Sequence, residues 1–194
     1  MNLATKLTIS RIVAIPVIVA LFYVVFPFHF LAAAILFVLA AITDIFDGKI
    51  ARKRGEVTTL GKLLDPIADK VLACTLLIMI AANGEEMMFF NPPVGVILTA
   101  LIVAREVLIG AFRMVAASKG SILAADSFGK IKTALINASI PIMMISEYHV
   151  AIKIVGNVLF ALGFVFAMVS GINYMVKNRS VLKDDASEEA GNND

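Results

Sequence analysis

Residues 44–69, DIFDGKIARKRGEVTTLGKLLDPIAD, set the architecture that we expect for this chain. They join two apolar runs and carry four aspartates in two pairs, Asp44 with Asp47 and Asp65 with Asp69. In an α-helix, side chains three or four positions apart are neighbours on one face. Each pair should therefore project from one face of its helix. The short connection between the pairs favours antiparallel neighbouring helices whose aspartates meet at one end.

The composition of the whole chain is typical of an integral membrane protein. Of 194 residues, 60% are apolar and 16% are charged, whereas ordinary soluble domains have about 45–50% and about 25%. This balance argues against a water-soluble globular domain and excludes disorder over most of the length. A single cysteine excludes an intrachain disulfide and a multi-cysteine metal site.

Six apolar runs predict an all-α bundle of six transmembrane helices, because each span needs about 20 residues. The runs cover residues 12–28, 30–43, 71–82, 94–104, 133–146 and 154–176. Charged stretches adjoin the second, third and fourth runs, and we expect them to continue the same helices and face the bundle interior. A signal peptide is the alternative for residues 12–28. The length of that run, and the second run that follows at once, favour a retained span.

The distribution of basic residues predicts the orientation. Lys153 is the only one of 17 Lys and Arg residues on the side of the loops at 26–31, 82–93 and 147–153. Cytoplasmic loops carry the excess of Lys and Arg. We therefore expect both termini in the cytoplasm, and a multi-pass protein of the cytoplasmic membrane whose aspartates face the cytoplasm.

Four aspartates inside a membrane need a compensating charge. Each ionised side chain costs about 2.5–3.5 kcal/mol on insertion scales, and nearby carboxylates repel one another. An all-oxygen ligand set suits hard cations such as Mg²⁺ or Mn²⁺. Two such ions would favour displacement at phosphorus. Salt bridges to neighbouring Lys and Arg are the alternative, but the paired spacing, Gly48 beside Asp47 and the nearby Arg52 favour the metal site.

The fixed positions of residues 44–69 follow the pattern D-x2-D-G-x2-A-R-x8-G-x3-D-x3-D. In this the chain resembles the CDP-alcohol phosphotransferase family, whose six-helix membrane bundle agrees with the predicted spans. The resemblance extends over nearly all of residues 2–177. Further pieces are similar to the branch of the family that uses glycerol 3-phosphate: residues 7–11, 64–70, 104–106 with Arg113, and 129–133.

This resemblance implies the domain organisation and a role for each site residue. Residues 1–177 would form one membrane-embedded catalytic domain, and the polar residues 178–194 a disordered cytoplasmic tail. Asp69 would be the general base. The residues implied to hold two Mg²⁺ or Mn²⁺ ions are Asp44, Asp47, Asp65 and Asp69. The residues implied to contact CDP are Gly48, Arg52 and Thr58.

The implied reaction transfers the phosphatidyl group of CDP-diacylglycerol to sn-glycerol 3-phosphate and releases CMP. The acceptor is a dianion and needs cations. Arg105 and Arg113 lie eight residues apart on one broad helix face, deep enough in a span to favour phosphate binding. The candidates that follow on the cytoplasmic side are Ser118, Lys119, Lys130 and Lys132. Orientation of the chain or contact with anionic lipid headgroups is the alternative for these lysines.

Two other functions stay open at this point. The same chemistry would serve another acceptor alcohol, such as inositol phosphate or serine. A cation-coupled transporter would need acidic residues along a path across the membrane, and we see none through the span centres.

The expected partners are CDP-diacylglycerol, glycerol 3-phosphate, membrane lipid and a second copy of the chain in a homodimer, with no nucleic acid. The small residues Gly163, Ala167 and Gly171 would pack either within the protomer or at that dimer seam.

Overall fold

The chain folds into helices throughout its described part. The structure, a computed structural model, describes residues 3–24, 26–54, 59–119 and 127–179, with the side chains of residues 11–24, 26–43, 67–119 and 128–179. No strand occurs in these ranges. The long helices are α1 (Leu3–Leu21), α2 (His29–Arg54), α3 (Thr59–Ala82), α5 (Pro92–Ser118), α6 (Ser127–Met144) and α7 (Val150–Lys177). The short elements are α4 (Gly84–Met87) and the 3₁₀ turn η1 (Ser146–Tyr148).

The long helices follow the order of the six apolar runs, so the predicted all-α class is confirmed. The charged stretches do continue the apolar helices: α2 reaches Arg54, α3 begins at Thr59 ahead of its aspartates, and α5 continues to Ser118. Pro141 lies inside α6.

Two helices in the described ranges, α5 and α7, are long and apolar enough to cross a membrane. Shorter apolar segments occupy residues 11–21 of α1 and 29–43 of α2. Both α5 and α7 expose large apolar side chains, among them Ile97, Leu101, Val107, Leu108, Val158, Leu162 and Val165. Soluble monomers rarely expose contiguous apolar patches of this kind. The fold and its surface are those of a membrane protein.

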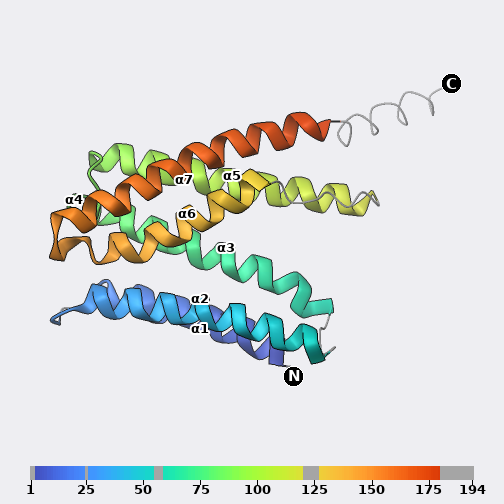
Figure 1. Ribbon diagram of the computed structural model, residues 1–194, viewed down its shortest axis with the longest axis horizontal. Helices are drawn as coiled ribbons and strands as arrows, with labels where there is room; N and C mark the ends of the chain where they lie inside the picture. The colour runs from blue at the N-terminus through green and yellow to red at the C-terminus, as the bar shows by residue number, and fades with distance from the viewer. Residues whose placement is uncertain (1–2, 25, 55–58, 120–126, 180–194) are drawn as a thin grey trace.

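The long helices alternate in direction through the bundle. Helices α2, α5 and α7 run toward the end of the molecule where α1 begins, and α3 and α6 run back (Figure 1). Helix α1 packs against α2 and α3, α6 packs against α7 and α2, and α5 packs against α3 and α7. We call the end where α1 begins the open end and the other the packed end.

The main hydrophobic core lies at the packed end. It joins the last turns of α1, α3 and α6 to the first turns of α2 and α7, and includes Ile18, Phe30, Leu76, Ile80, Ile140, Met143 and Phe160. A smaller cluster of Ile109, Phe112, Ala116 and Tyr174 joins α5 to α7 toward the open end. The remaining space at the open end forms the cavities described below.

The small-residue face of α7 packs within the protomer. A Cβ atom at Gly163 would lie 2.7 Å from Ile136 Cδ1 on α6, and one at Gly171 would lie 3.2 Å from Arg105 Nε on α5. Ala167 between them is fully buried. Of the two alternatives for this face, the structure selects packing inside one copy of the chain.

Candidate active site

A cavity of about 470 Å³ opens between α3, α5, α6 and α7, and we call it the larger cavity. Its charged lining residues are Lys70, Arg105, Glu106, Arg113, Lys130 and Lys132, and its other polar residues include Thr133, Asn137, Ser170 and Tyr174. Four of the cations predicted for the acceptor, on α5 and α6, therefore meet around one space. Five cations against one carboxylate give this space an excess of positive charge that suits an anion.

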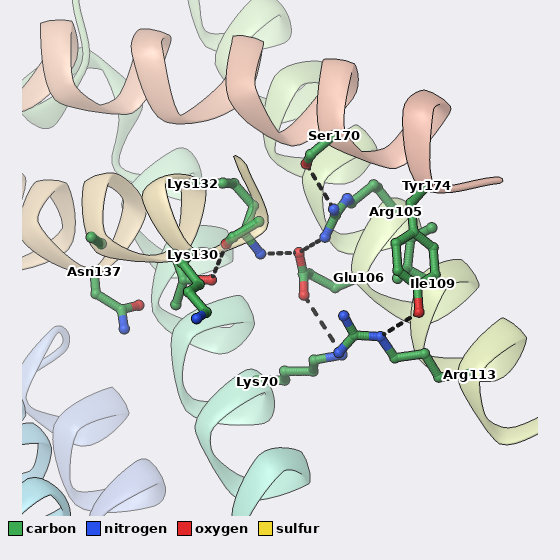
Figure 2. Close-up of a pocket in the computed structure, with 13 residues that line it drawn as sticks. Lys70, Arg105, Glu106, Ile109, Arg113, Lys130, Lys132, Asn137, Ser170 and Tyr174 are labelled. Carbon is green, nitrogen blue, oxygen red and sulfur yellow. Dashed lines mark hydrogen bonds and ion pairs between the residues drawn. The ribbon is translucent and has the colours of Figure 1, made fainter. Parts of the chain in front are cut away.

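Glu106 is the centre of the charged network (Figure 2). Its Oε1 accepts hydrogen bonds from Arg105 NH1 at 2.8 Å and from Lys132 Nζ. Its Oε2 lies 3.7 Å from Lys70 Nζ. The side chains of Glu106 and Lys132 are 11% and 8% exposed. Buried charges are tolerated when they are paired, and this carboxylate pairs with cations of three helices.

Arg105 on α5 is hydrogen-bonded to α7. Its Nε donates to the carbonyl of Ala167 at 3.1 Å, and NH2 donates to Ser170 Oγ at 2.9 Å. Gly171 allows the guanidinium to lie this close to the α7 backbone. Much of the donor capacity of Arg105 therefore serves the fold, a role that its sequence position did not reveal.

Arg113 and Lys130 remain available to a ligand. Arg113 Nε donates to the Tyr174 hydroxyl at 3.1 Å, and the guanidinium carbon lies 5.1 Å from the centre of the same ring. The terminal nitrogens of Arg113 and the ammonium of Lys130 make no hydrogen bond or ion pair with any residue that the structure describes. A guanidinium with both terminal nitrogens open can hold a phosphate bidentately.

A second space of about 240 Å³, the smaller cavity, adjoins the first. Its residues Lys70, Glu106, Lys132, Thr133 and Asn137 also line the larger cavity, and we call these five the shared wall. Asp69 and Cys74 line only the smaller cavity. The predicted general base thus lies on one side of the shared wall, and Arg113 and Lys130 lie on the other.

Asp69 forms an ion pair with Arg11, which the sequence analysis did not place in the site. Arg11 NH1 on α1 donates to Asp69 Oδ1 on α3. Arg11 is 3% exposed, whereas the Asp69 side chain is 52% exposed and lines the smaller cavity. A charged residue inside the first helix was the signal, because such residues tend to mark functional sites in membrane helices.

The other predicted metal and CDP residues are placed only by their backbone. Asp44, Asp47, Gly48 and Arg52 belong to α2, and Asp65 belongs to α3, but their side chains lie outside the described ones. Thr58 lies outside the described residues altogether, as do residues 180–194 of the predicted tail. Helix α2 ends and α3 begins at the open end (Figure 1), where a shared site would require them. The four-aspartate metal site stays a prediction.

Ser118 and Lys119 end α5 and are not among the described residues that line either cavity. Ser118 Oγ donates to the carbonyl of Val115 at 2.7 Å. Their predicted contact with the acceptor stays a prediction.

Sequence reasoning missed Lys70, Glu106, Asn137 and Tyr174 as site residues. Lys70 and Glu106 directly follow Asp69 and Arg105, and both interrupt apolar helices. That interruption was the available signal. Asn137 and Tyr174 carry no charge, and only the packing of α6 and α7 brings them to the cavity.

A comparison with protein families identifies the family of this chain. The family model described as CDP-alcohol phosphatidyltransferase matches residues 1–169. The chain belongs to this family.

Curated relatives carry one more specific name. Three proteins named CDP-diacylglycerol–glycerol-3-phosphate 3-phosphatidyltransferase are similar to this chain. The protein of Rickettsia bellii (strain RML369-C) is 36% identical over 89% of this chain and 93% of its own length. The protein of Sodalis glossinidius (strain morsitans) is 39% identical over 69% and 71%. The protein of Salmonella choleraesuis (strain SC-B67) is 31% identical over 94% and 98%.

Proposed function

We propose that this chain is a CDP-diacylglycerol–glycerol-3-phosphate 3-phosphatidyltransferase. It transfers the phosphatidyl group of CDP-diacylglycerol to sn-glycerol 3-phosphate, giving phosphatidylglycerophosphate and CMP for phospholipid biosynthesis. The observation that carries the proposal is the cation-lined larger cavity, which shares the five residues of the shared wall with the smaller cavity that Asp69 lines. The relatives with this name align with most of the chain and support the choice of acceptor.

The proposal includes six spans of the cytoplasmic membrane, with both termini and the open end at the cytoplasm. The bias of Lys and Arg and the alternating helix directions support it. CDP-diacylglycerol then keeps its acyl chains in the bilayer, while the soluble acceptor and CMP exchange with the cytoplasm. A homodimer is also proposed from the family resemblance. Its seam would lie away from the small-residue face of α7, which packs inside the protomer.

The acceptor phosphate would bind in the larger cavity. Arg113 offers its open guanidinium nitrogens and Lys130 offers its ammonium. Arg105 and Lys132, oriented by Glu106, add positive potential to the same wall. Ser118 and Lys119 would contact the acceptor from the end of α5. Charge-assisted hydrogen bonds of this kind are roughly twice as strong as neutral ones.

The reacting hydroxyl would then face Asp69. Asp69 accepts the proton of the sn-1 hydroxyl, and the hydroxyl oxygen bonds to the lipid-proximal β-phosphorus of CDP-diacylglycerol. The bond from this phosphorus to the bridging oxygen breaks, and CMP leaves. Arg11 holds the Asp69 carboxylate at the cavity wall. Gly48, Arg52 and Thr58 would bind the CDP moiety.

The donor chemistry of the aspartates fits hard divalent cations, because every ligand is a carboxylate oxygen and the described one, Asp69, is half-exposed. Two Mg²⁺ or Mn²⁺ ions held by Asp44, Asp47, Asp65 and Asp69 would neutralise the diphosphate of the donor. The chain itself contributes orientation and positive potential around the acceptor.

An acceptor panel tests the proposal. The purified protein in lipid nanodiscs receives CDP-diacylglycerol, Mg²⁺ or Mn²⁺, and either glycerol 3-phosphate, inositol phosphate or serine. We expect CMP release and a phosphatidylglycerophosphate product only with glycerol 3-phosphate, and loss of both after chelation. Turnover only with another acceptor would reject the proposed acceptor. No turnover with any acceptor in either metal would reject the enzyme and favour a transporter.

A further inference from the structure

The proposed function leaves one polar residue of the shared wall without a role. Four of the five shared-wall residues already have partners inside the protein. Lys70 and Lys132 pair with Glu106, and the Thr133 hydroxyl donates to the carbonyl of Gly129 at 2.9 Å. The fifth residue, Asn137, forms no hydrogen bond with any residue that the structure describes.

The position of Asn137 on α6 follows from helix geometry. Lys130, Thr133 and Asn137 are spaced by three and four residues, so they follow one another on one face. Lys130 reaches the larger cavity, and Asn137 lines both cavities. Along this face α6 passes from Lys130, which we propose binds the phosphate, to the smaller cavity that Asp69 lines.

Glycerol 3-phosphate has its groups in the same order. The phosphate is on the third carbon, the attacking hydroxyl is on the first, and a second hydroxyl lies between them. With the phosphate at Arg113 and Lys130 and the first hydroxyl at Asp69, the central hydroxyl falls at the shared wall. A carboxamide both donates and accepts hydrogen bonds, so it can pair with a hydroxyl in either direction.

We propose that Asn137 hydrogen-bonds the central hydroxyl of the acceptor and thereby selects a three-carbon phosphate that carries this hydroxyl. This inference rests on the proposed function and adds a specificity-determining residue to it. Sites that hydrogen-bond a substrate hydroxyl discriminate against analogues that lack it, because the protein group is then left unpaired.

The test compares two acceptors that differ only in the central hydroxyl, sn-glycerol 3-phosphate and 3-hydroxypropyl phosphate. We expect wild-type protein to prefer glycerol 3-phosphate in kcat/KM by about 10- to 100-fold, the range of one well-placed hydrogen bond. In Asn137→Ala the preference should fall below about threefold. The preference for sn-glycerol 3-phosphate over its mirror image should narrow in the same variant.

Controls separate the possible failures. Asn173→Ala removes an exposed amide from α7 that lines neither cavity, and it should keep the wild-type preference. Asn137→Ser is a milder change, and its preference for glycerol 3-phosphate should lie between those of the wild type and Asn137→Ala. This variant replaces Asn137→Ala in the test if Asn137→Ala does not fold. An unchanged preference in these Asn137 variants, or no preference in the wild type, would overturn the role of Asn137. No CMP release from wild type with either acceptor would instead overturn the proposed function.

Discussion

Two arginines eight positions apart on α5 have different surroundings. Arg105 donates hydrogen bonds to Glu106, Ala167 and Ser170. Among the residues that the structure describes, Arg113 donates only from Nε, to the Tyr174 hydroxyl, and its terminal nitrogens stay open to a ligand. The same residue type on one helix therefore joins helices at one position and faces a ligand space at the other. We expect substitutions at these positions to affect stability and substrate affinity differently.

Arg113→Ala should weaken binding of the acceptor, glycerol 3-phosphate, far more than binding of the donor, CDP-diacylglycerol. Loss of charge-assisted hydrogen bonds costs about 1.5–3 kcal/mol, so KM for glycerol 3-phosphate should rise by about 10- to 100-fold. The KM for CDP-diacylglycerol should change little. Steady-state kinetics with each substrate varied in turn measures both KM values. Arg113→Lys keeps the positive charge but loses the two terminal guanidinium nitrogens. Its KM for glycerol 3-phosphate should therefore lie between those of the wild type and Arg113→Ala. Equal effects on both substrates would contradict the assignment.

Glu106→Gln should destabilise the fold. The change removes the only carboxylate that pairs with the buried Lys132 in the described part of the chain. Breaking one side of a buried ion pair costs about 3–5 kcal/mol. Thermal unfolding in detergent micelles measures the loss as a lower Tm. Glu85→Gln on α4 is the control, because that side chain is exposed. An equal Tm for both variants would show that the ion pairs of Glu106 do not stabilise the fold.

At the scale of elements, α7 determines how closely the helices around the cavity approach. Its glycines face α6 and α5 at positions where a side chain would meet Ile136 or Arg105. Small residues at helix interfaces let backbones come together in membranes. The close approach brings Ser170 and Tyr174 within reach of the two arginines of α5.

Gly163→Val tests this packing. The first added carbon would lie 2.7 Å from Ile136 Cδ1, and overpacking of this kind costs about 1–3 kcal/mol. We expect a lower Tm in detergent micelles. Gly129→Val is the matched control, since a Cβ atom there meets no heavy atom within 4 Å. Equal Tm changes in the two variants would show that helix propensity, and not contact with α6, sets the cost.

The whole molecule is packed at one end and hollow at the other. The main core joins the last turns of α1, α3 and α6 at the packed end, and the charged cavities lie toward the open end. The basic residues also gather on the side of the open end. A soluble anionic acceptor would therefore meet positive charge and open space at the same face.

The proposed orientation makes a prediction at this scale. With the single native cysteine replaced, Cys74→Ser, one new cysteine is introduced by either Glu85→Cys at the packed end or Arg179→Cys after α7. Arg179→Cys should react with an impermeant maleimide only in inside-out vesicles, and Glu85→Cys only in intact cells whose outer surface is accessible. The proposed topology places an odd number of spans between the two positions, so reaction of both from the same side would contradict it.

The sequence by itself determined the helical class, the order of the long helices and the family. These properties depend on local composition and on residue spacing along one chain segment. The run of apolar residues sets each helix, and the spacing of Asp44, Asp47, Asp65 and Asp69 forms a pattern that is specific enough to indicate the family.

Only the tertiary structure decided which cations are open to a ligand. Arg105, Arg113, Lys130 and Lys132 look alike in the sequence, but Glu106 pairs with both Arg105 and Lys132. The α7 backbone accepts a further hydrogen bond from Arg105. It also decided that Arg11 meets Asp69 and that the small residues of α7 pack within the protomer. The physical reason is that helical periodicity defines the faces of one helix, whereas a side chain's partner depends on which other helix lies opposite that face.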